Sequence, residues 1–185
     1  MNRAKNILTE VIQFVPIITL AFTFIAKGGV DLEQAGPLFV ISGILAVGIT
    51  IWLITANVTQ NPILLASNIW LVVGALAFGV PIPALAALLS QTNAALLFAV
   101  ILLVGITQTA LKTPTGFIGM TNVAPHIVRR LSLIMLGLSA AILVWAVMFK
   151  SNIRLGGGLP FIVLNVTRRM LMRRATASGN SVQKA

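Results

Sequence analysis

The chain has 185 residues, of which 58% are hydrophobic and 9% are charged, and its mean hydropathy is +1.02. This composition is typical of integral membrane proteins and excludes an ordinary soluble domain. The formal charge of +10 lies along the edges of apolar segments instead of in one basic patch, which argues against a nucleic-acid-binding protein. The absence of Cys excludes disulfides, thiolate metal sites and Cys nucleophiles.

The apolar block over residues 34–111 contains no ionisable side chain at all. A charged group at the centre of a bilayer costs about 2.5–3.5 kcal/mol or more, so selection against charge explains the block. A chain of this length holds about six spans of roughly 20 residues joined by short loops. We therefore expect an all-α, polytopic membrane helix bundle of about six transmembrane helices, with no separate soluble domain.

The first span is expected over residues 7–26. A basic start followed by an apolar core also resembles a signal peptide. No small-x-small cleavage site follows it, however, and Lys27-Gly28-Gly29 ends the segment as a helix stop. We interpret it as an uncleaved span.

Pro, Gly and Asn mark the spans that follow. Gly36-Pro37 and Asn61-Pro62 are start signals, because Pro suits the first helical position and Asn caps the helix. Thr92 or Asn93 is expected to cap the fourth span. Residues 112–130 form the longest loop, in which Phe117, Ile118 and Met120 are expected to reach the membrane interface. The second to fifth spans are expected over residues 37–57, 62–80, 93–111 and 131–149.

The last apolar segment, residues 153–167, decides the topology. As a helix it would be about 22 Å long, against a hydrocarbon core of roughly 30 Å, so its length alone favours a re-entrant segment. Six spans with a cytoplasmic N-terminus place ten Lys and Arg residues inside and three outside, whereas five spans place five inside and eight outside. The positive-inside rule therefore favours six spans, with both termini cytoplasmic and the last span short.

The entry to this last span is rich in Gly and Pro. We expect broken or extended backbone over residues 156–158, because Gly is a poor helix former. The helix should start near Leu159, end near Arg174 and point Asn165 into the bundle. The transmembrane domain then covers residues 1–174, and residues 175–185 are expected to be a disordered cytoplasmic tail.

Polar residues within the spans gather in the cytoplasmic half. The candidate polar cluster consists of Glu10, Gln13, Asn68, Gln108 and Asn165. One interpretation is inter-helical hydrogen bonding worth about 0.6 kcal/mol per contact. Another is a polar vestibule open to the cytoplasm, with Glu10 as its only acid and Arg129, Arg130 or Arg168 as countercharges. Glu10 alternatively lies solvated at the headgroups beside Lys5.

Other candidate sites are simpler. The cations of the last helix are candidate contacts for anionic lipid headgroups, at about 1 kcal/mol each, or serve only to set the topology; they are Arg168, Arg169, Arg173 and Arg174. One histidine, His126, without Cys or paired carboxylates predicts no metal or cofactor. Three pairs of small residues at i, i+4 spacing are candidates for close helix packing or a dimer seam: Ser42/Ala46, Ala75/Gly79 and Gly137/Ala141.

A series of short motifs occupies the first 50 residues: Phe14-Val15-Pro16 in the first span, then Ala26-Lys27, then Asp31-Leu32 before a span of small residues. In these motifs the chain resembles the bacterial intracellular septation protein A family. The chain departs from that family in having no Tyr and few aromatic residues. The resemblance implies an inner-membrane protein linked to cell-envelope maintenance, and it carries over no functional residue.

The sequence contains no nucleotide-binding, hydrolase or metalloprotease motif. We therefore expect a non-enzymatic inner-membrane protein with a structural or accessory role through helix contacts, with the lipid bilayer and other membrane subunits or a second copy as partners. The alternative is a small transporter or channel that uses the polar cluster.

Overall fold

The computed structural model describes residues 3–26, 35–80, 82–92, 94–111, 115–120, 123–150, 152 and 154–182. Within these ranges the chain is all-α, as predicted, and contains no strand. The helices in chain order are α1 (Arg3–Ala26), α2 (Gly36–Thr55), α3 (Pro62–Gly79), α4 (Pro83–Thr92), α5 (Ala94–Ala110), α6 (Pro125–Met148) and α7 (Leu159–Val182). A π-helical turn, η1 (Arg154–Gly158), precedes α7.

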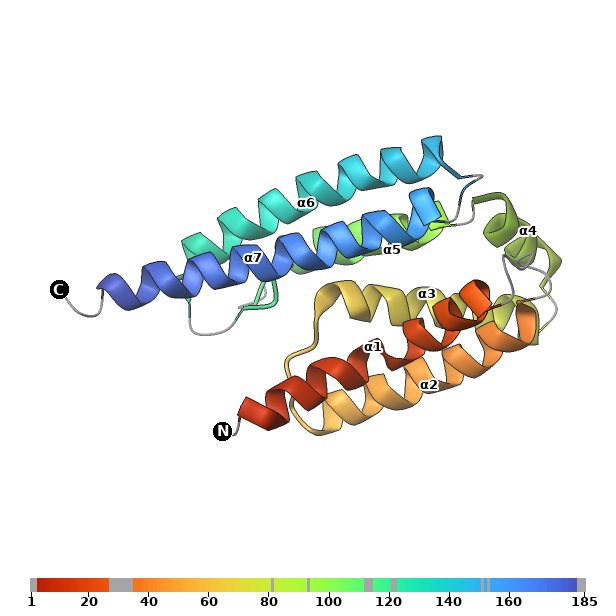
Figure 1. Ribbon diagram of the computed structural model, residues 1–185, viewed down its shortest axis with the longest axis horizontal. Helices are drawn as coiled ribbons and strands as arrows, with labels where there is room; N and C mark the ends of the chain where they lie inside the picture. Colours follow the sequence, from red (N-terminus) through yellow and green to blue (C-terminus); the bar gives the residue numbers. More distant parts are fainter. Residues whose placement is uncertain are drawn as a thin grey trace.

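The long helices form two groups of three (Figure 1). We call α1, α2 and α3 the first half, and α5, α6 and α7 the second half. Contacts are most extensive between α2 and α3 and between α5 and α6, and α3 against α5 joins the halves. The start of α1 and the end of α7 lie at one end of the bundle, which we call the terminal end, while α4 lies at the other (Figure 1).

Among the described residues, the helices α2, α3 and α6 are each long and apolar enough to cross a membrane. The pair α4 and α5, bent by 96°, makes a fourth if it counts as one span. In the described part of α1 the apolar stretch is Val11–Phe22, and α7 carries four arginines around its middle. The apolar helices indicate a membrane-embedded bundle, because every backbone hydrogen bond of a helix is satisfied within it.

The observed starts of α2 and α3 agree with the starts predicted from the sequence, and the start of α6 differs from its prediction. The Asn61 side chain accepts a hydrogen bond from the backbone N–H of Ile63 at 3.1 Å, so it caps α3 as predicted. Pro37 lies in the first turn of α2. In contrast, α6 starts at Pro125 and not at Leu131. Pro125 fits the first turn of a helix, where its missing N–H costs nothing, and so it starts α6 within the segment predicted to be a loop.

The last helix starts at Leu159, as predicted, but the glycines before it are not extended. They form the turn η1, in which the backbone N–H of Gly156 donates to the Asn152 carbonyl oxygen at 2.7 Å. A Cβ on Gly156 would lie 2.6 Å from the Phe149 carbonyl oxygen, so the turn fits only without a side chain. α7 continues past Arg174 to Val182, into the segment expected to be a disordered tail; residues 183–185 lie outside the described part.

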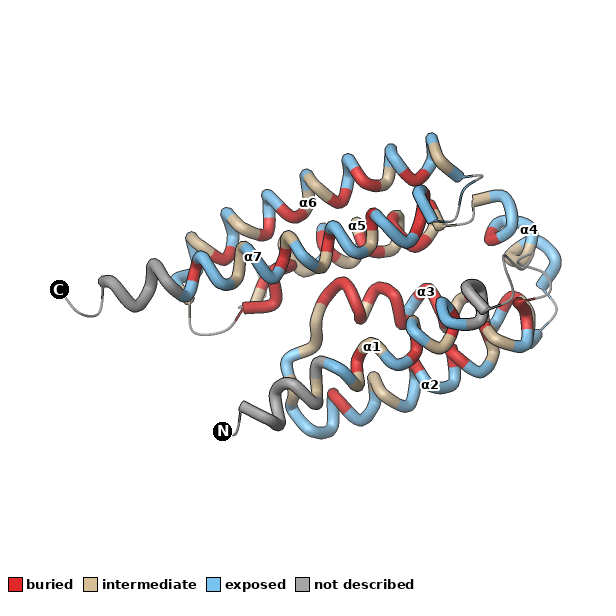
Figure 2. Tube along the Cα trace, viewed as in Figure 1, coloured by how far each residue is buried: buried red, intermediate tan, exposed pale blue. Residues whose placement is uncertain are grey.

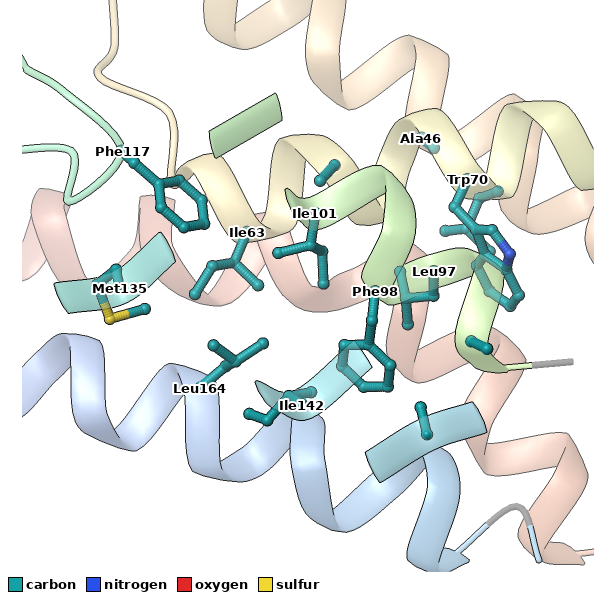
Figure 3. Packing of buried hydrophobic residues seen from close by; sticks show 14 of the residues in the cluster. Ala46, Ile63, Trp70, Leu97, Phe98, Ile101, Phe117, Met135, Ile142 and Leu164 are labelled. Carbon is teal, nitrogen blue, oxygen red and sulfur yellow. The ribbon is translucent and has the colours of Figure 1, made fainter. Parts of the chain in front are cut away.

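The hydrophobic core lies between the two halves (Figure 2). Figure 3 shows buried side chains of α3, α5, α6 and α7 meeting there: Ile63, Phe98, Ile101, Met135, Ile142 and Leu164. Within the first half, the Phe39 ring packs edge-on against Trp70, with 5.1 Å between ring centroids. Large apolar side chains on the outer faces are exposed, as expected of surfaces that meet lipid.

Two glycines bring α2 and α3 into close contact. A Cβ on Gly43 would lie 2.4 Å from the Ala75 Cβ and 3.0 Å from the Leu71 carbonyl oxygen. A Cβ on Gly74 would lie 2.2 Å from the Phe39 ring. The absence of side chains at these two positions lets the helix backbones approach closely, which is how membrane helices gain packing energy.

Gly43 and Gly48 provide a matched test of this contact. Both lie in α2, but a Cβ on Gly48 would meet nothing within 4 Å. Replacing either by Ala gains roughly 0.5–1 kcal/mol of helix stability. At Gly43 this gain is opposed by an overpacking cost of about 1–3 kcal/mol. We expect Gly43→Ala to lower the melting temperature in detergent and Gly48→Ala to raise it slightly; equal changes in both variants would contradict the close contact.

Candidate functional site

The polar residues predicted to cluster lie mostly around the connection between α2 and α3. Gln13 is buried in α1, and its Oε1 accepts a hydrogen bond from the backbone N–H of Asn61 at 3.0 Å. Buried amides need such partners, because an unpaired polar group in an apolar core costs about 1–3 kcal/mol. The bond ties α1 to the residue that caps α3.

A second pair of hydrogen bonds holds α2 to α3 and to the loop between them. The buried Asn68 Nδ2 donates to the Thr50 hydroxyl oxygen at 3.0 Å, and the Gln60 Nε2 donates to the Thr50 carbonyl oxygen at 3.4 Å. These contacts and the one made by Gln13 are inter-helical or helix-to-loop bonds of the kind the first interpretation describes.

Two other members of the predicted cluster, Gln108 and Asn165, lie on α5 and α7 in the second half of the bundle. Asn165 is half-buried, and its Nδ2 donates to the Phe161 carbonyl oxygen of its own helix at 3.0 Å. Gln108 is half-buried in α5 and faces the connection between α2 and α3 across a cavity. The side chain of Glu10 lies outside the described residues. The structure therefore groups Gln13 and Asn68 around one connection and leaves Asn165 on α7.

This cavity, which we call the terminal cavity, has a volume of about 540 Å³ and lies where α2 ends and α3 begins. Its lining combines the first half with two residues of the second half: Leu53, Ile54, Asn57, Val58, Thr59, Gln60, Pro62, Leu65, Gln108 and Thr115. Asn57 adopts a left-handed backbone conformation, with φ of 51°, which Asn tolerates better than most residues. None of the described residues that line the cavity is ionisable, so its polarity comes from amides and hydroxyls.

Beside the terminal cavity, residues 115–120 form a non-helical segment packed inside the bundle, which we call the buried loop. All of its residues except Thr115 are buried, and Phe117 and Ile118 are fully so. Phe117 and Met120 thus belong to the core and do not reach the membrane interface as predicted (Figure 3). Gly116 and Gly119 have positive φ values of 54° and 71°, conformations that side chains rarely adopt.

Arg168 holds the buried loop from α7. Its side chain is only 7% exposed, and its Nε donates to the Ile118 carbonyl oxygen at 2.8 Å. The backbone N–H of Ile118 donates to the Ser132 hydroxyl of α6 at 3.3 Å. A buried loop has no helix to satisfy its backbone, so side chains must do so. The prediction that Arg168 contacts lipid headgroups is therefore wrong, because its guanidinium points into the bundle.

The other arginines of α7 stay on the surface. The Arg169 guanidinium lies 5.9 Å from the centre of the Phe14 ring, which ties α7 to α1. Arg173 and Arg174 are exposed, and headgroup contact remains a prediction for them. His126 is exposed at the start of α6, and within the described ranges no three His, Cys, Asp or Glu residues gather as metal ligands would.

Comparison of the chain with protein-family models, with curated proteins and with solved structures gives no match.

The buried loop and the direction of Arg168 escaped sequence reasoning. The available signal was Gly116-Phe117-Ile118-Gly119, in which two large apolar residues lie between glycines beside a run of Pro and Thr. A solvated loop does not need apolar residues there. The glycines are required because a Cβ on Gly116 would lie 2.5 Å from the Ser132 hydroxyl oxygen, and one on Gly119 2.9 Å from the Arg168 Nη2.

Replacing Arg168 by Met should destabilise the bundle by about 1–3 kcal/mol, because the Ile118 carbonyl loses a donor where water cannot replace it. The matched control is Arg169→Met, which removes the same charge from an exposed position and one cation–π contact worth about 0.5–1 kcal/mol. Thermal unfolding of both variants in detergent measures the difference. Equal melting temperatures would show that the buried loop does not depend on Arg168.

Proposed function

We propose that this chain is a non-enzymatic, six-span protein of the cell inner membrane, with both termini cytoplasmic, that acts as a structural or accessory subunit through helix–helix contacts. Two observations support the six spans. The helices α1, α2, α3, α5, α6 and α7 run along the long axis of the bundle, and the start of α1 and the end of α7 lie at the same end of it (Figure 1). With these ends cytoplasmic, ten of the thirteen Lys and Arg residues lie inside.

The outward face of α6 is the surface that would contact a partner helix in the proposed role. Gly137 and Ala141 are exposed on this helix, and a Cβ on Gly137 would meet nothing within 4 Å. Their i, i+4 spacing places both on one face. A flat face of small residues is the surface that a second membrane helix packs against most closely.

The small-residue pairs of α2 and α3 differ from the pair on α6 in their surroundings. Ser42 and Ala46 are buried in α2, and Ala75 of α3 contacts the position of Gly43. These pairs are used inside the first half, whereas the pair on α6 is left to the outside. The resemblance to the intracellular septation protein A family supports placing such a subunit in cell-envelope maintenance.

The topology has a direct test. A reporter fused after Ala185 should give a cytoplasmic signal, and a reporter fused after Lys150 should give a periplasmic one, because six spans place the connection between α6 and α7 outside. Paired alkaline phosphatase and green fluorescent protein fusions measure both positions. A periplasmic signal after Ala185 from an otherwise intact protein would contradict six spans.

The helix-contact role is tested by Gly137→Leu. A bulky side chain should separate α6 from its partner and abolish a complex that co-purifies with the wild-type chain in mild detergent. Gly48→Leu is the matched control, since it makes the same change at an exposed glycine with open space around it. Loss of the complex in both variants, or in neither, would contradict the α6 interface.

A small transporter or channel is the second candidate function, and the terminal cavity favours it. Its amide and hydroxyl lining is suited to a polar, uncharged solute at the cytoplasmic end of the bundle. The same purification separates the two functions. A stable hetero-complex supports the accessory role, and a monomer or homodimer supports transport.

A further inference from the structure

A second cavity lies along the outer side of α2 and α3, and we call it the α2–α3 groove. It has a volume of about 250 Å³ and is lined mainly by aliphatic side chains, including Val47, Ile51, Ile69 and Val73. Val47 is 43% exposed and Ile51 is 56% exposed, so the groove is open to the lipid side. The two polar residues in its lining, Thr50 and Asn68, are hydrogen-bonded to each other.

The groove and the terminal cavity lie on the same faces of the two helices. Leu65 of α3 lines both of them. Ala46 and Thr50 of α2 line the groove, and Leu53 and Asn57 line the cavity. Ala46, Thr50 and Leu53 follow one another at four- and three-residue steps, which keeps them on one face of α2, and Asn57 lies just beyond the end of that helix. The two volumes are therefore successive parts of one depression that runs toward the terminal end.

The length of this depression matches one leaflet of a bilayer. From Ala46 to the end of α2 at Thr55 the helix rises about 14 Å, which is close to half of a hydrocarbon core of roughly 30 Å. Ala46 lies near the middle of α2. Before that point, the contacts of Gly43 with Ala75 and of Gly74 with Phe39 hold α2 and α3 close together. The depression thus runs from the bilayer middle to the surface on one side only.

The two ends of this depression differ in polarity. The groove is apolar, while Thr59, Gln60, Gln108 and Thr115 bring amides and hydroxyls to the terminal cavity. A partner helix would cross both leaflets and does not fit a depression that is closed in one of them. A lipid has the required order, with an acyl chain at the bilayer middle and a hydrogen-bonding headgroup at the surface. The amides and hydroxyls of Thr59, Gln60 and Gln108 are hydrogen-bonding partners for a hydroxyl-bearing headgroup.

We propose that the α2–α3 groove and the terminal cavity form one binding site for a membrane lipid with a neutral, hydroxyl-bearing headgroup, of which diacylglycerol is the simplest. An acyl chain lies along Val47, Ile51 and Ile69, and the headgroup hydroxyl bonds to the amide and hydroxyl groups around Thr59 and Gln60. This site is built mainly from α2 and α3, with Gln108 and Thr115 at the terminal cavity, and does not rest on the accessory role of α6.

The test uses the full chain in phosphatidylcholine nanodiscs with a diacylglycerol probe that carries a photoreactive diazirine on one acyl chain. Saturable labelling should fall on the groove residues of α2 and α3 and be displaced by unlabelled diacylglycerol. Val47→Phe fills the groove and should reduce labelling about tenfold, since one misfitted side chain changes apolar binding by 10–200-fold. Ile44→Phe makes a similar change on the same helix at a 67% exposed position outside the groove and should leave labelling unchanged.

The headgroup arm uses Thr59→Val combined with Gln60→Leu, which removes hydrogen-bonding groups and keeps the volumes similar. Labelling by the diacylglycerol probe should fall, whereas labelling by a probe with a methylated headgroup hydroxyl should change less. Ile69→Trp fills the groove from α3 and replaces Val47→Phe if that variant does not retain the wild-type melting temperature.

Three results would overturn the proposal. Labelling spread evenly over all exposed helices and unaffected by Val47→Phe would indicate surrounding lipid only. Better displacement by phosphatidic acid than by diacylglycerol would exclude a neutral headgroup site. Absence of groove labelling, with a change of oligomeric state in Val47→Phe, would show that a second protein chain covers the groove.

Discussion

The hydrogen bond from the Arg168 Nε to the Ile118 carbonyl oxygen determines how the second half of the bundle is assembled. Non-helical backbone inside an apolar core has to find partners for its N–H and C=O groups, and lipid offers none. Ile118 finds both, its carbonyl with α7 and its N–H with Ser132 of α6. Pro62 at the start of α3 lies close to Gly119 of the same loop. Six residues of loop thereby hold the start of α3, the Ser132 turn of α6 and the middle of α7 relative to one another.

Residue size decides which helix faces are internal. Gly43 and Gly74 make α2 and α3 a closely packed pair, and Gly105 of α5 does the same for the buried loop, since its Cβ would lie 2.9 Å from the Phe117 ring. Each of these contacts buries a small-residue surface within the bundle. Gly137 faces outward with nothing against it, so the same kind of surface is left available on α6. Because small-residue surfaces elsewhere in the bundle make close contacts, the exposed one on α6 is a candidate contact surface for another chain.

Much of the helical layout was predictable, because local chemistry sets helix ends. Asn61-Pro62 starts α3 and Leu159 starts α7, both as expected. The start of α6 was misplaced because Pro125 has two opposite meanings, a breaker inside a helix and a good residue in its first turn. The inward direction of Arg168 was not predictable in this way, since its partner is fifty residues distant in sequence. The π-helical turn at residues 154–158 likewise depends on the carbonyls of Phe149 and Asn152 that it approaches.

The polar cluster illustrates the same limit. Hydropathy along the spans predicted that polar side chains gather toward one end, because buried amides and hydroxyls are tolerated only where partners exist. It did not determine which partners they choose, and Gln13 and Asn68 bond to Asn61 and Thr50 and not to each other. On the face of α2 that meets α3, Gly43 and Ala46 are followed by the larger residues Thr50 and Leu53. The α2–α3 groove and the terminal cavity lie beyond that point, with volumes of about 250 Å³ and about 540 Å³. The close contact at Gly43 and the open spaces beyond Ala46 therefore follow the order of side-chain sizes along this face of α2, and the amides and hydroxyls of the lining lie toward the terminal end.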